Sequence, residues 1–144
     1  MVTGYLMLNK NIIISLTISM TISAIVAQVF STQDDYLNST FTLISGYFVY
    51  YSIFTTLYYR DNKKAYKTEL GNTNTARLKM DLKKMVLTVG VGEVSFLASK
   101  WTSQYYLLTQ NFEPYVAAIL AHLVGSALLL AMMNLTAKKT HLYK

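Results

Sequence analysis

Four long apolar segments constrain the fold of this chain more than any other feature. They cover residues 11–31, 38–59, 84–108 and 114–137. Each approaches the roughly 20 apolar residues that a helix needs to cross a hydrocarbon layer about 30 Å thick. Only 14% of the residues are charged, whereas soluble domains carry about 25%. The sequence therefore indicates an integral membrane protein.

The first segment also shows a pattern that is typical of a β-strand. Its residues Ser15, Thr17, Ser19, Thr21 and Ser23 alternate with apolar residues, which is the strand period of two. A membrane barrel needs many such segments, and residues 117–133 are almost continuously apolar instead. We therefore expect an all-α polytopic membrane protein. Residues 1–144 would form a single domain of four transmembrane helices, arranged as a bundle of two helical hairpins.

A cleaved signal peptide is an alternative explanation of the first segment, which follows Lys10 near the start of the chain. Signal peptides carry an apolar run of about 7 to 15 residues and then a cleavage site of small residues. The run here is longer, and no clear cleavage site follows it. We expect the first segment to be a membrane helix.

Small residues form three stripes at helical spacing. One stripe contains Ser15, Ser19, Ser23 and Ala27, the second contains Ser95, Ser99 and Ser103, and the third contains Ala117, Ala121 and Gly125. Such stripes let membrane helices approach one another closely. They predict tight packing within the bundle, or with other membrane subunits or a second copy of the chain.

The basic residues predict the orientation in the membrane. Apart from Lys100, they occur at Lys10, in residues 60–84 and in residues 138–144, whereas the short loops around Asp34 and Glu113 contain no Lys or Arg. The positive-inside rule then places both termini and the loop 60–83 in the cytoplasm, where residues 77–84 are expected to extend the third helix. We expect a multi-pass protein of the cell membrane. Its net charge of +6 is explained by topology and anionic lipids, without a nucleic-acid partner.

Three ionisable residues stand out within the apolar segments. Glu93 lies near the centre of the third segment, where a carboxylate costs about 3 kcal/mol on insertion scales. Lys100 follows seven residues later, on the same helical face and about 10 Å further along. His122 reaches a similar depth if residues 109–113 close a hairpin. Together they predict a substrate or proton path through the bundle.

The alternative gives these residues no function. Glu93 would be neutral or hydrogen-bonded to Ser and Thr groups, Lys100 would extend outward to the interface, and His122 would only pack against its neighbours.

Tyrosines divide into two groups by depth. Rings at helix ends are typical of an interfacial belt, and these are Tyr58, Tyr59, Tyr105 and Tyr106. Tyr47, Tyr50 and Tyr51 lie deeper, where a hydroxyl needs a partner. They are expected to face other helices, a cavity or a neighbouring subunit, and we assign Tyr47 and Tyr51 to the substrate or proton path.

Motifs for catalysis and metal binding are missing from the sequence. It contains no cysteine, and His122 and His141 fall on opposite sides of the expected span. The glycines of residues 89–92 lie inside an apolar segment and not after a strand, so they do not form a phosphate-binding loop. We expect no enzymatic activity, no metal and no cofactor. Asn38 begins a glycosylation acceptor pattern beside the second segment.

Several short runs resemble the GtrA-like family of small four-helix membrane proteins. The similar runs are KMVLTVGVG at 84–92, PYVAAILA at 114–121, YYRDNKK at 58–64, and Asn134 before Lys138 and Lys139. The resemblance implies a protein that moves polyprenyl-phosphate-linked sugars across the membrane. Basic residues at the inner rim would hold the phosphate, and the aromatic helix would face the sugar or the prenyl chain.

The inner rim is also a candidate site on electrostatic grounds alone. Six lysines lie where the second, third and fourth helices meet the cytoplasm, at Lys63, Lys64, Lys83, Lys84, Lys138 and Lys139. Each basic residue near an anionic membrane surface contributes about 1 kcal/mol. These lysines are predicted to bind anionic lipid.

Two other functions compete with lipid-linked sugar translocation. A noncatalytic subunit of a larger membrane enzyme complex is favoured by the small-residue stripes and the deep tyrosines. A small proton-coupled exporter is favoured by Glu93, although the small multidrug resistance family carries its carboxylate in the first helix and this chain carries it in the third.

Overall fold

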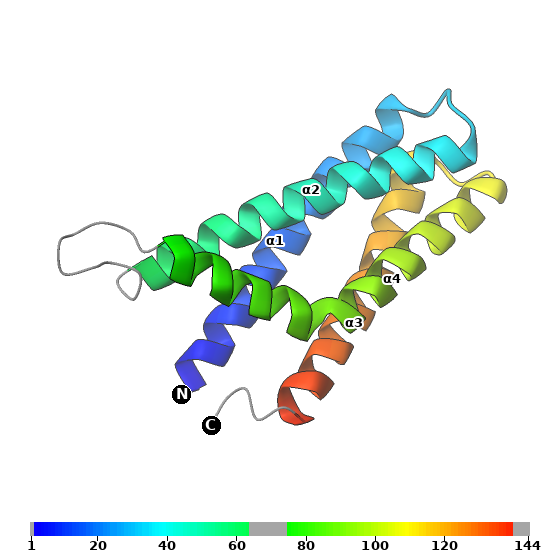
Figure 1. The fold of residues 1–144 in the computed structure, drawn as a ribbon. Coiled ribbons are helices and arrows are strands. Elements are labelled where there is room, and N and C mark those ends of the chain that lie inside the picture. Colours follow the sequence, from blue (N-terminus) through cyan, green and yellow to red (C-terminus); the bar gives the residue numbers. More distant parts are fainter. Residues whose placement is uncertain (1, 64–74, 140–144) are drawn as a thin grey trace.

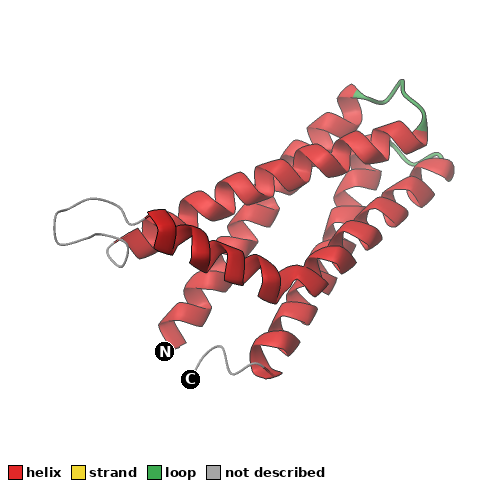
Figure 2. Ribbon diagram, viewed as in Figure 1, coloured by secondary structure: helices red, strands yellow, loops and turns green. Residues whose placement is uncertain are grey.

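The computed structural model describes residues 2–63 and 75–139, which form four helices (Figure 1). Helix α1 spans Val2–Val29, α2 spans Asp35–Asn62, α3 spans Thr75–Thr109 and α4 spans Pro114–Lys139. The described residues contain no strand (Figure 2). The all-α fold is thereby confirmed, and the alternating pattern in the first segment belongs to a helix.

The helices extend further than the apolar segments from which they were predicted. Helix α2 continues to Asn62 and α3 already begins at Thr75, so part of the expected loop 60–83 is helical. Apolar composition marks where a helix can meet lipid, and the helix itself continues into polar sequence that contains good helix formers such as Ala76 and Met80. Residues 64–74 lie outside the described part of the chain.

The helices pack in a ring, in which α1 contacts α2 and α4, and α3 contacts α4 and α2. The start of α1, the end of α4 and the ends of α2 and α3 that flank residues 64–74 lie at one end of the bundle (Figure 1). The two short turns lie at the other end. This arrangement is the pair of helical hairpins that the segment lengths predicted.

Side chains define the turn between α1 and α2. The Asp34 carboxylate caps α2, accepting a hydrogen bond from the Leu37 backbone amide at 2.8 Å. The Asn38 amide donates to the carbonyls of Ala27 at 2.8 Å and Phe30 at 3.0 Å, and so satisfies the end of α1. Asn38 is buried by these contacts, so in the folded chain its amide is part of the turn.

The turn between α3 and α4 closes with a Schellman motif. The Phe112 amide donates to the Leu107 carbonyl at 3.1 Å and the Asn111 amide to the Leu108 carbonyl at 2.9 Å. Asn111 takes a φ of 61°, a left-handed conformation that asparagine tolerates better than most residues. Pro114 then starts α4, in the first-turn position that its missing amide favours.

The interior of the bundle is unusually polar. Its fully or almost fully buried polar side chains come from all four helices, and they include Asn11, Ser15, Ser19, Ser23, Asn38, Ser39, Thr42, Lys100, Gln104 and His122. Large apolar side chains are exposed instead, with Phe48 at 73% and Val94 at 68%. Soluble proteins show the opposite distribution. Helices α1 and α4 contain segments, Leu6–Val29 and Pro114–Met133, that are long and apolar enough to cross a membrane.

Asp61 of α2 forms hydrogen bonds with α1 at the end of the bundle where the chain begins. Its carboxylate accepts hydrogen bonds from the Asn11 amide at 3.0 Å and from Lys10 Nζ at 3.4 Å, and Arg60 Nε lies 3.7 Å away. The hydrogen bond from Asn11, supported by the charges of Lys10 and Arg60, lowers the pKa of Asp61.

This lowered pKa gives a pH-dependent stability. A depressed carboxyl pKa stabilises the fold above the ordinary aspartate pKa of about 4, and this contribution disappears as the pH falls through the folded-state value. We expect Asp61→Asn to lower the unfolding temperature of the protein in detergent at neutral pH. The difference from the unsubstituted protein should vanish in acid. A constant difference at all pH values would show that the carboxylate charge does not contribute.

Candidate functional site

One face of α3 places long polar side chains at the centre of the bundle. The buried residues on this face are Glu93, Phe96, Lys100, Gln104 and Leu108, which follow the spacing of three and four residues that keeps side chains on one helical face. The predicted stripe of Ser95, Ser99 and Ser103 is only half-buried. Helix α3 therefore packs through its long residues, whereas the predicted stripes of α1 and α4 are buried as expected.

Lys100 is the most unusual residue of the interior, because its side chain is 0% exposed. Its ammonium donates to Ser23 Oγ at 2.9 Å and lies 5.9 Å from the centre of the Phe96 ring. Lys100 forms no ion pair in the described part of the chain. An ammonium has three N–H donors, so two of them lack a described acceptor. The alternative in which Lys100 extends to the interface is wrong.

Small residues of α1 and α2 make the space for this ammonium. Ser19 Oγ donates to the Gly46 carbonyl at 2.6 Å, which draws the two helices together. A Cβ atom at Gly46 would lie 2.7 Å from Lys100 Nζ and would also collide with Ser23 Oγ. Only glycine therefore leaves room at this position for the amine in its observed place.

His122 and Gln104 add further unused polar atoms beside Lys100. His122 is 1% exposed, and its ring meets the edge of Phe96 with 5.4 Å between centroids. Neither ring nitrogen has a partner at hydrogen-bond geometry among the described residues, although the Leu16 backbone and the Lys100 charge are close by. Gln104 donates to Asn38 Oδ1 at 3.2 Å, and its own Oε1 lacks a described partner. Buried polar groups of this kind each cost about 1–3 kcal/mol.

We call this group of residues the central polar site. Its members are Ser19, Ser23, Gly46, Lys100, Gln104 and His122. It combines one buried amine with several unused donors, and it is assembled by all four helices.

Glu93 belongs to a second group, the Glu93 cluster, with Tyr47 and Tyr51. The Tyr51 hydroxyl donates to Glu93 Oε1, and the Tyr47 and Tyr51 rings pack edge to face at 4.7 Å between centroids. Glu93 is 8% exposed. Its partner is thus a tyrosine and not the Ser or Thr groups of the alternative. Of the path residues expected from the sequence, Glu93, Lys100 and His122 are buried, and Tyr47 and Tyr51 are half-buried. They form two groups separated by about 10 Å along α3.

Four members of the central polar site were missed by sequence reasoning as site residues. Ser19 and Ser23 were noted only as small packing residues, and Gly46 and Gln104 were not singled out. Gln104 did carry a signal, because it follows Lys100 by one helical turn. Gly46 is the only glycine of α2, which is a weaker signal.

The structure describes only part of the inner rim of six lysines, which we call the basic rim. Lys63 and Lys83 are exposed at the ends of α2 and α3 that share one end of the bundle. Lys64 lies outside the described residues, as do the side chains of Lys84, Lys138 and Lys139. The expected lipid contacts of this rim stay a prediction.

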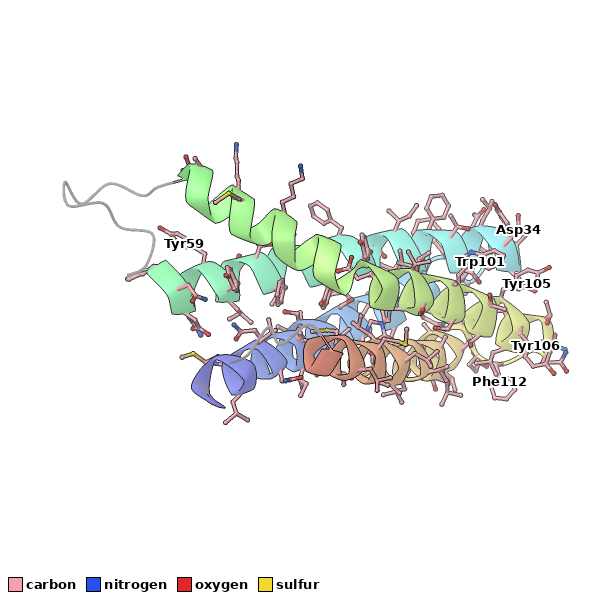
Figure 3. The ribbon with its side chains drawn as sticks, turned by 60° about the horizontal axis from the view of Figure 1, so that its bottom comes forward. Asp34, Tyr59, Trp101, Tyr105, Tyr106 and Phe112 are labelled. Carbon is pink, nitrogen blue, oxygen red and sulfur yellow. The ribbon has the colours of Figure 1, made fainter. Side chains whose placement is uncertain are left out.

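Aromatic side chains gather at the opposite end. Figure 3 shows Trp101, Tyr105, Tyr106 and Phe112 there, far from Tyr59. The Trp101 and Tyr105 rings stack at 5.3 Å between centroids, and Trp101 Nε1 donates to Thr40 Oγ1 at 3.2 Å. Tyr105 and Tyr106 are exposed, and exposed rings with polar tips at a helix end are the arrangement that an interfacial belt predicts.

Comparison with known proteins gives no match to any protein family, to any curated protein or to any solved structure. The GtrA-like resemblance therefore stays a prediction. Function has to be inferred from the chemistry of the two interior groups.

Proposed function

We propose that this protein crosses the membrane four times, with both termini in the cytoplasm, and moves an anionic lipid of the polyprenyl-phosphate-sugar class across it. Helices α2 and α3 have 28 and 35 residues, which correspond to about 42 and 52 Å and exceed a hydrocarbon layer of about 30 Å. The polar interior and apolar exterior support this placement, and the one-sided distribution of basic residues supports the orientation.

The buried ammonium of Lys100 carries the proposal for the substrate. A positive charge that is completely buried without an anionic partner is costly. A phosphate group would supply an anion in direct contact with Lys100, together with oxygen acceptors for the unused donors of Lys100 and His122. Lysine binds phosphate as a flexible point charge, which suits a group that must be held and then released.

The two ends of the bundle fit the same function. Lys63 and Lys83 lie exposed at the end assigned to the cytoplasm, where basic residues concentrate anionic head groups near the surface. The central polar site then lies further into the bundle, and the aromatic rings around Trp101 lie at the far end. The GtrA-like resemblance points to the same substrate class.

The test is retention of lipid by the full chain in a gentle detergent, measured by native mass spectrometry. We expect Lys100→Gln to retain a polyprenyl phosphate at least about tenfold less well than the unsubstituted protein, since a hydrogen bond to a charged group contributes about 1.5–3 kcal/mol. Retention of an ordinary anionic phospholipid should change little. Lys79→Gln, which alters an exposed lysine of α3, is the matched control.

The basic rim is tested by replacing Lys83, Lys84, Lys138 and Lys139 with Gln together. Preferential loss of the prenyl phosphate would support an entry site on the translocation path. Equal loss of both lipids would mean that these lysines only set the orientation of the chain in the membrane. If Lys100→Gln retains both lipids and a second membrane protein copurifies in equal amount, the chain is a subunit of a larger complex instead.

The orientation has its own test, because the natural chain has no cysteine. Single variants Asp34→Cys and Gly71→Cys can be exposed to a membrane-impermeant thiol reagent on intact cells. We expect labelling at position 34 and none at position 71 until the membrane is opened. Labelling of position 71 from outside would overturn the orientation.

A further inference from the structure

The charges inside the bundle are few, and each can be named. Facing the neighbourhood of Glu93 and Lys100, α2 contributes Tyr47, Tyr50 and Tyr51, and α4 contributes His122. Within residues 11–29, α1 has no ionisable side chain. Glu93 and Lys100 are therefore the one carboxyl and the one ammonium among these interior groups.

Glu93 and Lys100 also share the buried face of α3. Seven residues separate them, which is about 10 Å along the helix, and Phe96 lies between them on that face. Both are buried, so salt screens their interaction far less than it would screen two exposed charges. Opposite charges at this separation attract one another more strongly inside the bundle than they would in water, because the effective dielectric constant of a protein interior is lower.

Charge balance links the two groups. With no anion bound, an ionised Glu93 and a charged Lys100 give the interior a net charge of zero. An anion that binds beside Lys100 adds one negative charge, which makes an ionised Glu93 unfavourable. A proton taken up by Glu93 restores the balance. The Tyr51 hydroxyl suits both states, because it can donate to a carboxylate or to the carbonyl oxygen of a neutral carboxyl.

We propose that Glu93 is a proton-binding site coupled to the central polar site, so that the bundle takes up one proton with each phosphate-bearing anion. The inference rests on the proposed function in one respect, that an anion binds beside Lys100. The proton comes from the bulk solution and is held on a Glu93 carboxyl oxygen. The negative charge of the anion is matched by Lys100, and the net charge of the interior does not change.

The coupling predicts a pH dependence of anion binding. If one proton accompanies each anion, the affinity rises about tenfold for each unit by which the pH falls, as long as Glu93 is ionised in the empty protein. Glu93→Gln carries a neutral side chain of the same shape at every pH. This variant should bind the anion tightly and without pH dependence. Tyr51→Phe is the matched control, because it removes the hydrogen bond but keeps the carboxyl and so keeps the pH dependence.

The probe is a farnesyl phosphodiester bound to the full chain in detergent. A phosphodiester keeps a single negative charge throughout, whereas the second pKa of a phosphate monoester is about 6 and would confuse the measurement. Over about two pH units near neutrality, we expect the affinity of the unsubstituted protein to change up to about 100-fold and that of Glu93→Gln to stay constant. Addition of the anion to a weakly buffered sample should also remove protons from solution.

The outcomes separate the inference from the proposed function. Anion binding with no pH dependence, or with the same dependence in Glu93→Gln, overturns the coupling at Glu93. No binding of the phosphodiester at any pH overturns the proposed function. It also overturns the inference that Glu93 takes up a proton with the anion.

A second measurement needs no ligand. Removing the positive charge by Lys100→Gln should make Glu93 take up a proton in the empty protein. Infrared spectroscopy detects this proton as the carbonyl stretch of a neutral carboxyl. We expect the band in Lys100→Gln, and we expect it to be missing from the unsubstituted protein and from the Lys100→Gln, Glu93→Gln double variant. A band of equal size in the unsubstituted protein would overturn the coupling.

Discussion

Replacing Lys100 with methionine is expected to stabilise the bundle and to abolish its retention of lipid phosphate. In the proposed four-span arrangement, a charged lysine near the centre of α3 costs about 3 kcal/mol on insertion scales. Methionine keeps most of the length of the side chain and removes the charge. The hydrogen bond to Ser23 is lost, which costs about 1 kcal/mol. The free energy of unfolding should therefore rise by about 2 kcal/mol.

The measurement is the unfolding transition in detergent, followed together with lipid retention on the same preparation. Lys79→Met is the matched control, because Lys79 is exposed on α3 near its start, and it should change neither quantity appreciably. A less stable Lys100→Met protein would contradict the expected net cost of the buried charge. Such a result would mean that the ammonium stabilises the empty bundle, through its hydrogen bond to Ser23 or its attraction to Glu93.

Much of the fold was predictable, because long apolar segments indicate long helices from composition alone. The four apolar segments located all four helices, and the stripe from Ser15 to Ala27 located the packing face of α1. Pro114 marked the start of α4. The helix ends were less predictable: the extension of the third helix through residues 77–84 was expected, whereas the start of α1 at Val2, ahead of the apolar segment 11–31, was not.

The candidate site was predictable only where a residue is anomalous by itself. Glu93, Lys100 and His122 stand out because ionisable groups are rare in apolar segments. Their grouping was not predictable, because it depends on how each helix is rotated about its own axis. The rotation of α2 turns Tyr51 towards Glu93, and it turns Gly46 towards Lys100. The stripe marked Ser19 and Ser23 as packing residues, but nothing in the sequence showed that Lys100 would contact Ser23 or that Gly46 would lie beside it.

Gly46→Ala is expected to destabilise the bundle by about 1–3 kcal/mol, the usual cost of adding volume to a packed interior. The new Cβ would lie 2.7 Å from Lys100 Nζ, so the amine must move or the helices must separate. Anion retention should weaken as well, since the amine leaves its observed position. The matched control is Gly90→Ala, where a Cβ meets nothing within 4 Å. In α3 this change should stabilise the helix by up to about 1 kcal/mol.

The cause of the Gly46→Ala effect can be isolated by combining it with Lys100→Met. Methionine lacks the terminal atom that approaches position 46, so part of the clash disappears, while the contact with Ser23 Oγ remains. The alanine should therefore destabilise the Lys100→Met protein less than it destabilises the unsubstituted protein. Residues in direct contact show interaction energies of about 0.5–3 kcal/mol between their substitutions. A value in this range would show that the small size of Gly46 is needed to place the ammonium. Strictly additive effects would instead assign Gly46 to the packing of α2 against α1, with the Ser19 hydrogen bond as its main consequence.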